Sequence, residues 1–162
     1  PSLLIADEPT TALDVTIQAQ LLDLLRDAQR ARGASMLLIT HDLGVVAESA
    51  QRVAVMYAGQ IVEQAPVADL FDAPQHPYTQ GLMAAMPRAG TRRDRLTTIP
   101  GTVPPPGAWP RGCRFADRCA FAWNRCSQEA PALHTLKNGR TSRCHLVQEP
   151  ERAATALAQA DS

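Results

Sequence analysis

A run of consecutive apolar residues that ends in two acids opens the chain and most constrains its fold. Leu3 to Ala6 contains no polar side chain, and Asp7 and Glu8 follow directly. Strands covered on both faces, as in parallel sheets, have continuous apolar runs. Strands with one solvent-exposed face instead alternate apolar and polar residues. The sequence therefore predicts a buried parallel strand whose carboxyl end carries two carboxylates.

Alternating helix and strand patterns follow this run. A helix is predicted from Val15 to Arg32, with Asp14 as its N-cap and Gly33 as its stop, because apolar residues recur on one face. The further expected elements are strands at 36–39 and 53–56, a short helix capped by Asp42 and running to about Ala50, a hairpin turn at Gly59 into a strand at 61–62, and helices at 67–71 and 78–86. This order predicts an α/β layer fold.

Composition divides the chain into parts of different character. Residues 1–87 hold four basic and ten acidic side chains, and residues 88–162 hold twelve and six. We expect an α/β domain at 1–87, a proline-rich linker at 88–110, a cysteine-rich module at 111–148 and a tail at 149–162. A module this short rarely builds a sufficient hydrophobic core, so we expect an additional stabilising cross-link such as a bound metal.

The composition also excludes several classes of protein. The 45% hydrophobic and 20% charged content is typical of a folded chain, and no apolar run approaches the roughly 18 to 20 residues that span a bilayer. The single lysine, Lys137, does not stand in a G-x-x-x-x-G-K-[ST] phosphate-binding loop. Because a strand-like run directly follows Pro1, we expect a C-terminal fragment of a longer protein.

Polar residues also follow the second predicted strand, where Thr40, His41 and Asp42 end it. The carboxyl ends of neighbouring parallel strands share one edge of a sheet, which is where open α/β sheets bind ligands. There Asp7 would hold Mg²⁺, and Glu8 would orient and deprotonate an attacking water. An isolated Asp-Glu pair is more often only a polar strand end, but the ordered set favours the functional interpretation.

In this order the motifs resemble those of the nucleotide-binding subunit of ATP-binding cassette (ABC) transporters. Leu3–Glu8 resembles the Walker B strand, Thr11–Asp14 the D-loop, and His41 the switch histidine. The chain is thus expected to be the C-terminal part of a P-loop ABC ATPase domain.

The resemblance implies a role for each of these residues. Asp7 would serve Mg²⁺, Glu8 would be the general base, Asp14 would communicate with a second ATPase subunit, and His41 would contact the γ-phosphate of ATP. The phosphate-binding, glutamine and signature loops precede Walker B in this family, so these residues would supply only half of a site.

All four cysteines follow the predicted linker. Cys113, Cys119, Cys126 and Cys144 are separated by gaps of five, six and seventeen residues. Disulfides fit an even count but are rare in a reducing compartment, and zinc fits four thiolates although short C-x₂₋₄-C pairs are absent. An iron–sulfur cluster also takes four thiolates and tolerates varied spacing. The spacing leaves these alternatives open.

Basic residues surround the cysteines and are opposed locally only by Asp117 and Glu129. They would offset the charge of a thiolate-bound centre, or form a nucleic-acid patch. The residues are Arg111, Arg114, Arg118, Arg125, Arg140 and Arg143.

The cysteine-rich segment resembles the C-terminal extension of the ATP-binding subunits of oligopeptide and dipeptide importers. The similarity includes 76–79 (His-Pro-Tyr-Thr), Pro100-Gly101, Gly112 to Phe115, Arg118-Cys119 and Cys144-His145. It implies a 4Fe-4S cluster on all four cysteines, with zinc as the alternative. The aromatic residues that would pack around it are Trp109, Phe115, Phe121 and Trp123.

This resemblance implies an ATPase subunit that powers peptide import from the cytoplasmic face of the membrane. Its expected partners are a second ATPase subunit, identical or related, transmembrane permease subunits and, indirectly, a substrate-binding protein, with no nucleic acid. An alternative is a metal-cluster-binding interaction module with an inactive ATPase half. A DNA-acting ABC ATPase would share the first motifs but would not explain the segment from His76 or the cysteines.

Overall fold

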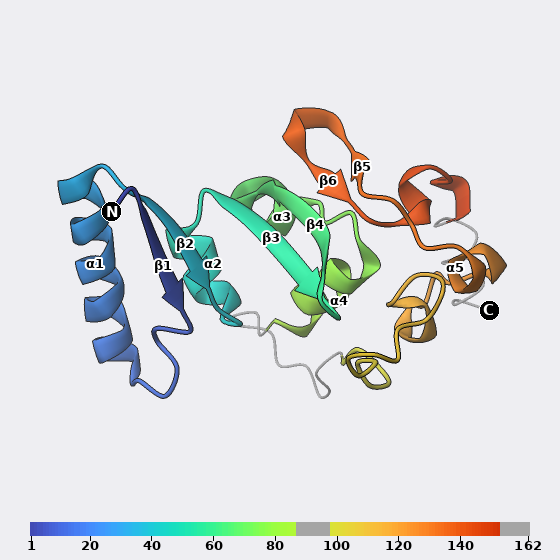
Figure 1. The fold of residues 1–162 in the computed structure, drawn as a ribbon, viewed down its shortest axis with the longest axis horizontal. Coiled ribbons are helices and arrows are strands. Elements are labelled where there is room, and N and C mark those ends of the chain that lie inside the picture. Colours follow the sequence, from blue (N-terminus) through green and yellow to red (C-terminus); the bar gives the residue numbers. More distant parts are fainter. Residues whose placement is uncertain (87–97, 153–162) are drawn as a thin grey trace. The chain divides into compact units, whose positions relative to one another are not determined.

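The computed structural model describes residues 1–86 and 98–152, which form a mixed α/β structure (Figure 1). The chain divides into two compact units, residues 1–51 and 52–162. Part of the predicted linker, residues 88–97, and most of the predicted tail, residues 153–162, lie outside the described residues. In the described part, no helix combines the length and apolar character that crossing a membrane requires.

The first unit is a strand–helix–strand arrangement. β1 (Leu3–Asp7) and β2 (Ser35–Ile39) pair in parallel, joined through α1 (Val15–Arg32), and α2 (Leu43–Ser49) follows. Figure 1 shows α1 running alongside the two strands. The predicted strands and helices of this unit are confirmed.

The ends of α1 follow from local chemistry. The Asp14 carboxylate accepts a hydrogen bond from the backbone N–H of Ile17 at 3.0 Å, which satisfies a donor that the helix leaves free. At the other end Gly33 adopts φ +59°, a left-handed conformation that favours glycine, and its N–H bonds to the carbonyl of Arg30. Both predicted caps are confirmed.

The β1–β2 pair buries only one of its faces in this unit. Ala6 on the inner face is 8% exposed, whereas Ile5 and Leu37, which are partners in the ladder, are 59% and 50% exposed. The continuous apolar runs predicted burial of both faces, and these residues cover only one.

The second unit is built on an antiparallel sheet that begins with the hairpin predicted at Gly59. β3 (Arg52–Tyr57) forms a hairpin with β4 (Gln60–Pro66) through Ala58 and Gly59, both at positive φ, as two-residue hairpin turns require. The sheet continues through β6 (Thr141–Ser142) to β5 (His134–Thr135). The predicted hairpin is therefore confirmed, and β6 and β5 are additional strands that the sequence analysis did not predict.

Short helices complete this unit. They are α3 (Val67–Asp72), α4 (Pro77–Ala85), α5 (Asn124–Gln128) and the 3₁₀ turns η1 (Ala116–Arg118), η2 (Lys137–Gly139) and η3 (His145–Val147). The helices predicted at 67–71 and 78–86 are thus present with bounds shifted by one residue. His76 caps α4, since its Nδ1 accepts the N–H of Tyr78 at 3.1 Å.

The cysteine-rich segment shares one core with the β3–β4 hairpin. Phe115 is 3% exposed and packs with Tyr57 and Leu70, and its ring centroid lies 5.2 Å from that of Tyr57. The compact units of the structure therefore do not follow the predicted division between 1–87 and 111–148. The reason is that residues 52–86 supply the apolar surface that this short segment lacks.

Candidate functional site

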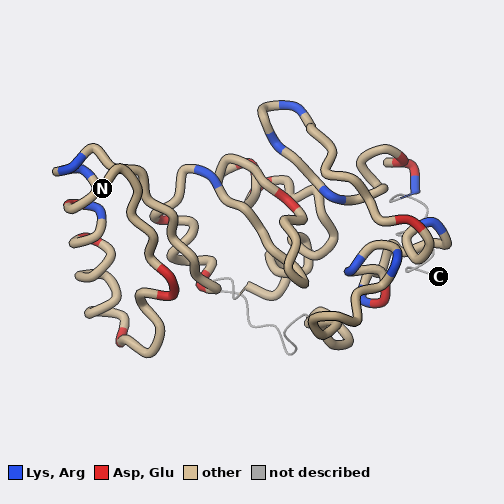
Figure 2. Tube along the Cα trace, viewed as in Figure 1, with Lys and Arg blue, Asp and Glu red and all other residues tan. Residues whose placement is uncertain are grey.

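A first candidate site, which we call the strand-end site, consists of Asp7, Glu8, Thr11 and His41. Parallel pairing continues one residue beyond β1, because the Glu8 N–H donates to the carbonyl of Ile39 at 2.9 Å. This pairing brings the two strand ends together, so that His41 Nδ1 lies 2.9 Å from Glu8 Oε1. The structure thus joins two of the residues predicted from the sequence. Figure 2 shows the acidic character at the end of β1.

The carboxylate of Glu8 has two side-chain partners. Thr11 Oγ1 donates to Oε2 at 2.6 Å, and His41 Nδ1 lies 2.9 Å from both Oε1 and Oε2. The hydrogen bonds from Thr11 and then His41 lower the pKa of Glu8, and the bond to Glu8 raises the pKa of His41. Glu8 also adopts φ +47°, which is uncommon for a residue with a side chain and is typical of functional positions.

Thr11 is the residue of this site to which sequence reasoning gave no role. The signal was a hydroxyl three residues after an acid, at the start of a turn where Ser and Thr often bond to nearby groups. The turn is closed by the Thr11 N–H donating to the Glu8 carbonyl at 3.2 Å. Asp7 is exposed at the end of β1, and the Asp14 side chain serves as the cap of α1.

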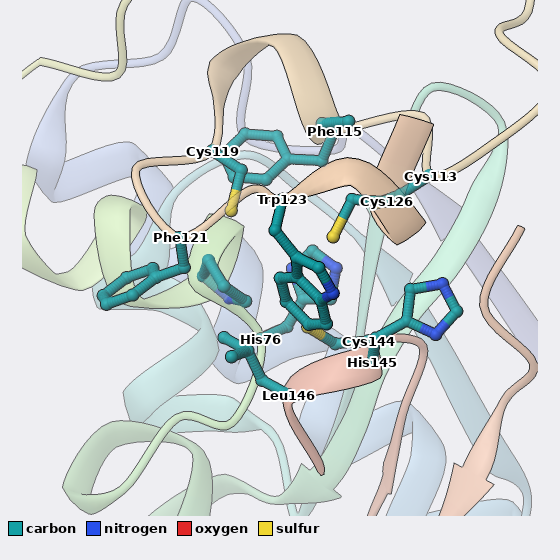
Figure 3. Close-up of a pocket in the computed structure, with 12 residues that line it drawn as sticks. His76, Cys113, Phe115, Cys119, Phe121, Trp123, Cys126, Cys144, His145 and Leu146 are labelled. Carbon is teal, nitrogen blue, oxygen red and sulfur yellow. The ribbon is translucent and has the colours of Figure 1, made fainter. Parts of the chain in front are cut away.

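A second candidate site lies wholly within the second unit, and we call it the cysteine pocket. Its space is about 300 Å³, including the part open to solvent. The lining residues are His76, Pro77, Cys113, Phe115, Ala116, Cys119, Phe121, Trp123, Cys126, Cys144, His145 and Leu146. Figure 3 shows the side chains, with the sulfur atoms of Cys119 and Cys126 pointing toward its middle. The structure therefore brings all four predicted cysteines, as free thiols, to one place.

Backbone contacts fix two of the cysteine segments against each other. The N–H of Cys113 donates to the carbonyl of Cys126 at 2.7 Å. The preceding residue, Gly112, leaves no space for a side chain, because an added Cβ would lie 2.6 Å from the carbonyl carbon of Ser127 and closer still to the Cys126 oxygen. Glycine is required here for a close approach of two backbone segments.

Burial favours the neutral thiol at three of the pocket cysteines. Desolvation raises the pKa of Cys119 and of Cys144 to about 12, and it raises the pKa of Cys113 as well. Thiolates in this pocket therefore require a compensating positive charge.

His76 links the start of α4 to the segment that carries Cys144. It is 1% exposed, and its side chain hydrogen-bonds to the backbone of Arg143. Burial lowers the pKa of His76 to about 4, so the ring is neutral at ordinary pH. Sequence reasoning used this histidine only as part of a family motif, and its burial against the pocket is decided by the tertiary structure.

The arginines around the cysteines hold loops together instead of facing the pocket. Arg118 donates to the carbonyls of Pro100 and Ile99 at 2.7 and 3.1 Å, and Arg143 donates to that of Ile61 at 3.0 Å. Arg114 and Arg140 likewise bind backbone carbonyls, and Arg125 pairs with Glu129 and Glu149. The pairing of Arg125 with two carboxylates leaves it little charge to offset thiolates, whereas the arginines bound to neutral carbonyls keep their positive charge, so the expectation that they offset thiolates stays a prediction.

The cysteine pocket does not contain a preformed metal site. Throughout residues 1–86 and 98–152, no three His, Cys, Asp or Glu side chains form a group that could hold one metal ion. The expected metal-cluster module is therefore not shown by the ligand geometry, and the cluster stays a prediction.

Comparison with known proteins identifies the chain. Residues 62–126 match the family described as the C-terminal region of oligopeptide/dipeptide transporters. Over 149 residues, 92% of this chain, it is 57% identical to the oligopeptide transport ATP-binding protein AppD of Bacillus subtilis, of which the match covers 45%. It is 55% identical over 155 residues to a peptide import ATP-binding protein of Brucella ovis, covering 46% of that protein.

The chain thus spans about half the length of the curated relatives it matches. The matched family region begins in β4 and ends at Cys126, so it includes the α4 cap and three of the four cysteines. Residues 62–126 therefore belong to the oligopeptide/dipeptide transporter C-terminal region family, and over 92% of its length the chain is similar to ATP-binding proteins of peptide import.

Proposed function

We propose that the chain is the C-terminal part of an ATP-hydrolysing subunit that energises import of oligopeptides or dipeptides. The observation that carries this proposal is the contact between Glu8 and His41 at the shared end of β1 and β2. It would act at the cytoplasmic face of the membrane with a second ATPase subunit, permease subunits and, indirectly, a substrate-binding protein. The names of its relatives support this role. A paired acid and histidine favours an active over a degenerate ATPase half.

In this function Glu8 accepts the proton of the attacking water. Thr11 and His41 both contact the carboxylate, and since its two oxygens have about four lone-pair sites, acceptor capacity remains for the attacking water. The two donors fix the orientation of the base and keep it ionised. His41, whose side chain is 80% exposed, is free to reach the γ-phosphate of ATP.

Asp7 would hold Mg²⁺, which supplies positive charge to the phosphates. Its exposed carboxylate, next to Glu8, fits a hard cation that prefers oxygen ligands. Asp14 would communicate with the second subunit.

The test uses a longer protein that contains this chain together with the phosphate-binding loop that the family resemblance implies. Glu8→Gln should reduce steady-state phosphate release by about a thousandfold while ATP binding persists, since an amide keeps the shape but cannot take the proton. Glu48→Gln, an exposed position on α2, is the matched control and should retain the rate. Equal rates in Glu8→Gln and the control would disprove the proposal.

We further propose that Cys113, Cys119, Cys126 and Cys144 bind a 4Fe-4S cluster. The support is that four thiols, and no carboxylate, line one pocket with a largely aromatic and aliphatic wall. Each iron of such a cluster takes one thiolate, so the ligands surround it instead of converging on a single ion as in a zinc site. Binding of iron would displace the protons that burial holds on the thiols.

Iron and acid-labile sulfide analysis after anaerobic reconstitution tests the cluster. We expect about four of each per chain, and loss of both in the variant with all four cysteines changed to serine. A colourless protein with one zinc would favour the zinc alternative, and unchanged iron in the fourfold variant would exclude these ligands.

A further inference from the structure

We propose that Trp123 closes the cysteine pocket and controls how fast reagents reach its thiols. Trp123 lines the pocket and directly precedes α5, the helix that carries Cys126. Its backbone carbonyl accepts the N–H of Cys126 at 2.8 Å, so the backbone of Trp123 is part of the turn that presents this thiol. In Figure 3 the indole crosses the middle of the pocket and lies in front of the sulfur of Cys144 in this view.

Two groups hold the half-buried indole in place. The ring of His145, which is 2% exposed, meets it edge-on, with 6.1 Å between the ring centroids. The guanidinium of Arg152 lies 5.2 Å from the centroid of the indole. Cation–π contacts of this kind favour one ring position over others.

A chain of ion pairs fixes Arg152 over the ring. Arg152 Nε lies 2.9 Å from one oxygen of Glu149, and the other oxygen lies 2.7 Å from Arg125 Nη1. Arg125 is also held by Glu129, through contacts of 2.9 and 3.1 Å. Because Arg125 is next to Cys126 in α5, the segment after Cys144 is fastened back onto the helix that carries another pocket cysteine.

This arrangement gives Trp123 a role beyond filling space. A hydrophobic shell around a site controls the access of solvent. The position of Trp123 in this shell depends on the cation–π contact with Arg152 and on the ion pairs that hold Arg152. With the proposed cluster bound, the same ring would slow the loss of iron to chelators. That extension rests on the proposed cluster, whereas closure of the thiol pocket does not.

The first test uses the full 162-residue chain, reduced and metal-free, and measures alkylation of the cysteines by iodoacetamide. Trp123→Ala should raise the rate about tenfold, and Trp123→Phe, which keeps an aromatic ring, should stay close to the unsubstituted chain. Trp109→Ala is the matched control, because Trp109 is exposed and does not line the pocket. An unchanged rate in Trp123→Ala would overturn the proposal.

A second variant separates closure from folding. Arg152→Ala removes the cation–π contact with Trp123 but changes no residue that lines the pocket. It should raise the alkylation rate about threefold with an unchanged urea midpoint. If Trp123→Ala lowers the urea midpoint, the Arg152→Ala rate decides, and a rate equal to that of the unsubstituted chain overturns the proposal.

The final arm follows iron loss from the reconstituted chain to an excess of a ferrous chelator, under anaerobic conditions. Faster loss from Trp123→Ala than from Trp109→Ala supports the extension to the cluster, and equal loss overturns it. Failure of the unsubstituted chain to take up iron would refute the cluster proposal but not the closure of the pocket by Trp123. The alkylation rates test that closure independently of iron.

Discussion

The strand-end site and the cysteine pocket place their reactive groups in opposite environments. Glu8 and His41 are exposed at the end of a parallel strand pair, and their positions follow from strand register and a short turn. The cysteines are largely buried, and four separate chain segments bring them together. Local structure therefore decides the first site, and long-range packing decides the second.

This difference predicts how each region responds to substitution. Changes at the strand-end site should alter turnover with little effect on stability, because exposed side chains contribute little to the core. Changes around the cysteine pocket should alter stability and thiol access first. The following predictions test this separation.

The largest effect is expected for Glu63→Ala in β4. The Glu63 carboxylate is fully buried, lies 3.6 Å from Arg140, and accepts the backbone N–H groups of Gln75 and His76, each at 2.8 Å. Its removal leaves all three donors without this acceptor and should cost about 4 kcal/mol in the free energy of unfolding. Urea denaturation of the full chain measures this free energy.

The control for Glu63 is Asp23→Ala, which removes an exposed ion pair with Arg26 from α1. It should change the unfolding free energy by less than about 1 kcal/mol. Equal losses of unfolding free energy in Glu63→Ala and Asp23→Ala would contradict the expectation that buried groups of the second unit contribute more stability than exposed groups of the first.

The next effect in size is the loss of turnover in His41→Ala. Removing the imidazole takes away a partner of Glu8 and the proposed phosphate contact, so phosphate release by the protein with its phosphate-binding loop should fall about a hundredfold. The thermal midpoint should stay the same. Partial recovery in His41→Asn, which keeps a side-chain donor, would sharpen the interpretation, and a lowered midpoint would show that the site is also structural.

Gly112→Ala should have a smaller but specific effect on the second unit. A methyl group there would overlap the backbone at Cys126 and Ser127, so the two cysteine segments must move apart at a cost of about 2 kcal/mol. Gly107→Ala is the control, since φ +87° strains that backbone too, but nothing lies within 4 Å of the added atom. Alkylation rates and urea midpoints that match between the two variants would show that the close approach is unimportant.

The smallest effect is expected for Thr11→Val. The change keeps the shape of the side chain but removes the hydroxyl that donates to Glu8 at 2.6 Å. One lost hydrogen bond corresponds to about a fivefold decrease in turnover. A larger decrease than that of His41→Ala, measured by phosphate release, would mean that Thr11 and not His41 is the main support of the base.

Local chemistry in the sequence determined the first unit. The apolar run from Leu3, the Asp14 cap, the Gly33 stop and the polar strand ends predicted β1, α1, β2 and the meeting of Glu8 with His41. These features depend on neighbours within a few residues or on the pairing of two consecutive strands. Periodicity, capping and register are all visible in a single sequence.

Only the tertiary structure decided how the second unit is assembled. The sequence revealed four cysteines and nearby arginines, but it did not show that Phe115 completes the core of the β3–β4 hairpin or that Arg114 and Arg143 bind carbonyls far along the chain. It predicted the hairpin itself but not that β6 and β5 extend its sheet. The arginine contacts join residues 56 to 82 positions apart, and packing and burial select them from many pairings that the sequence equally allows.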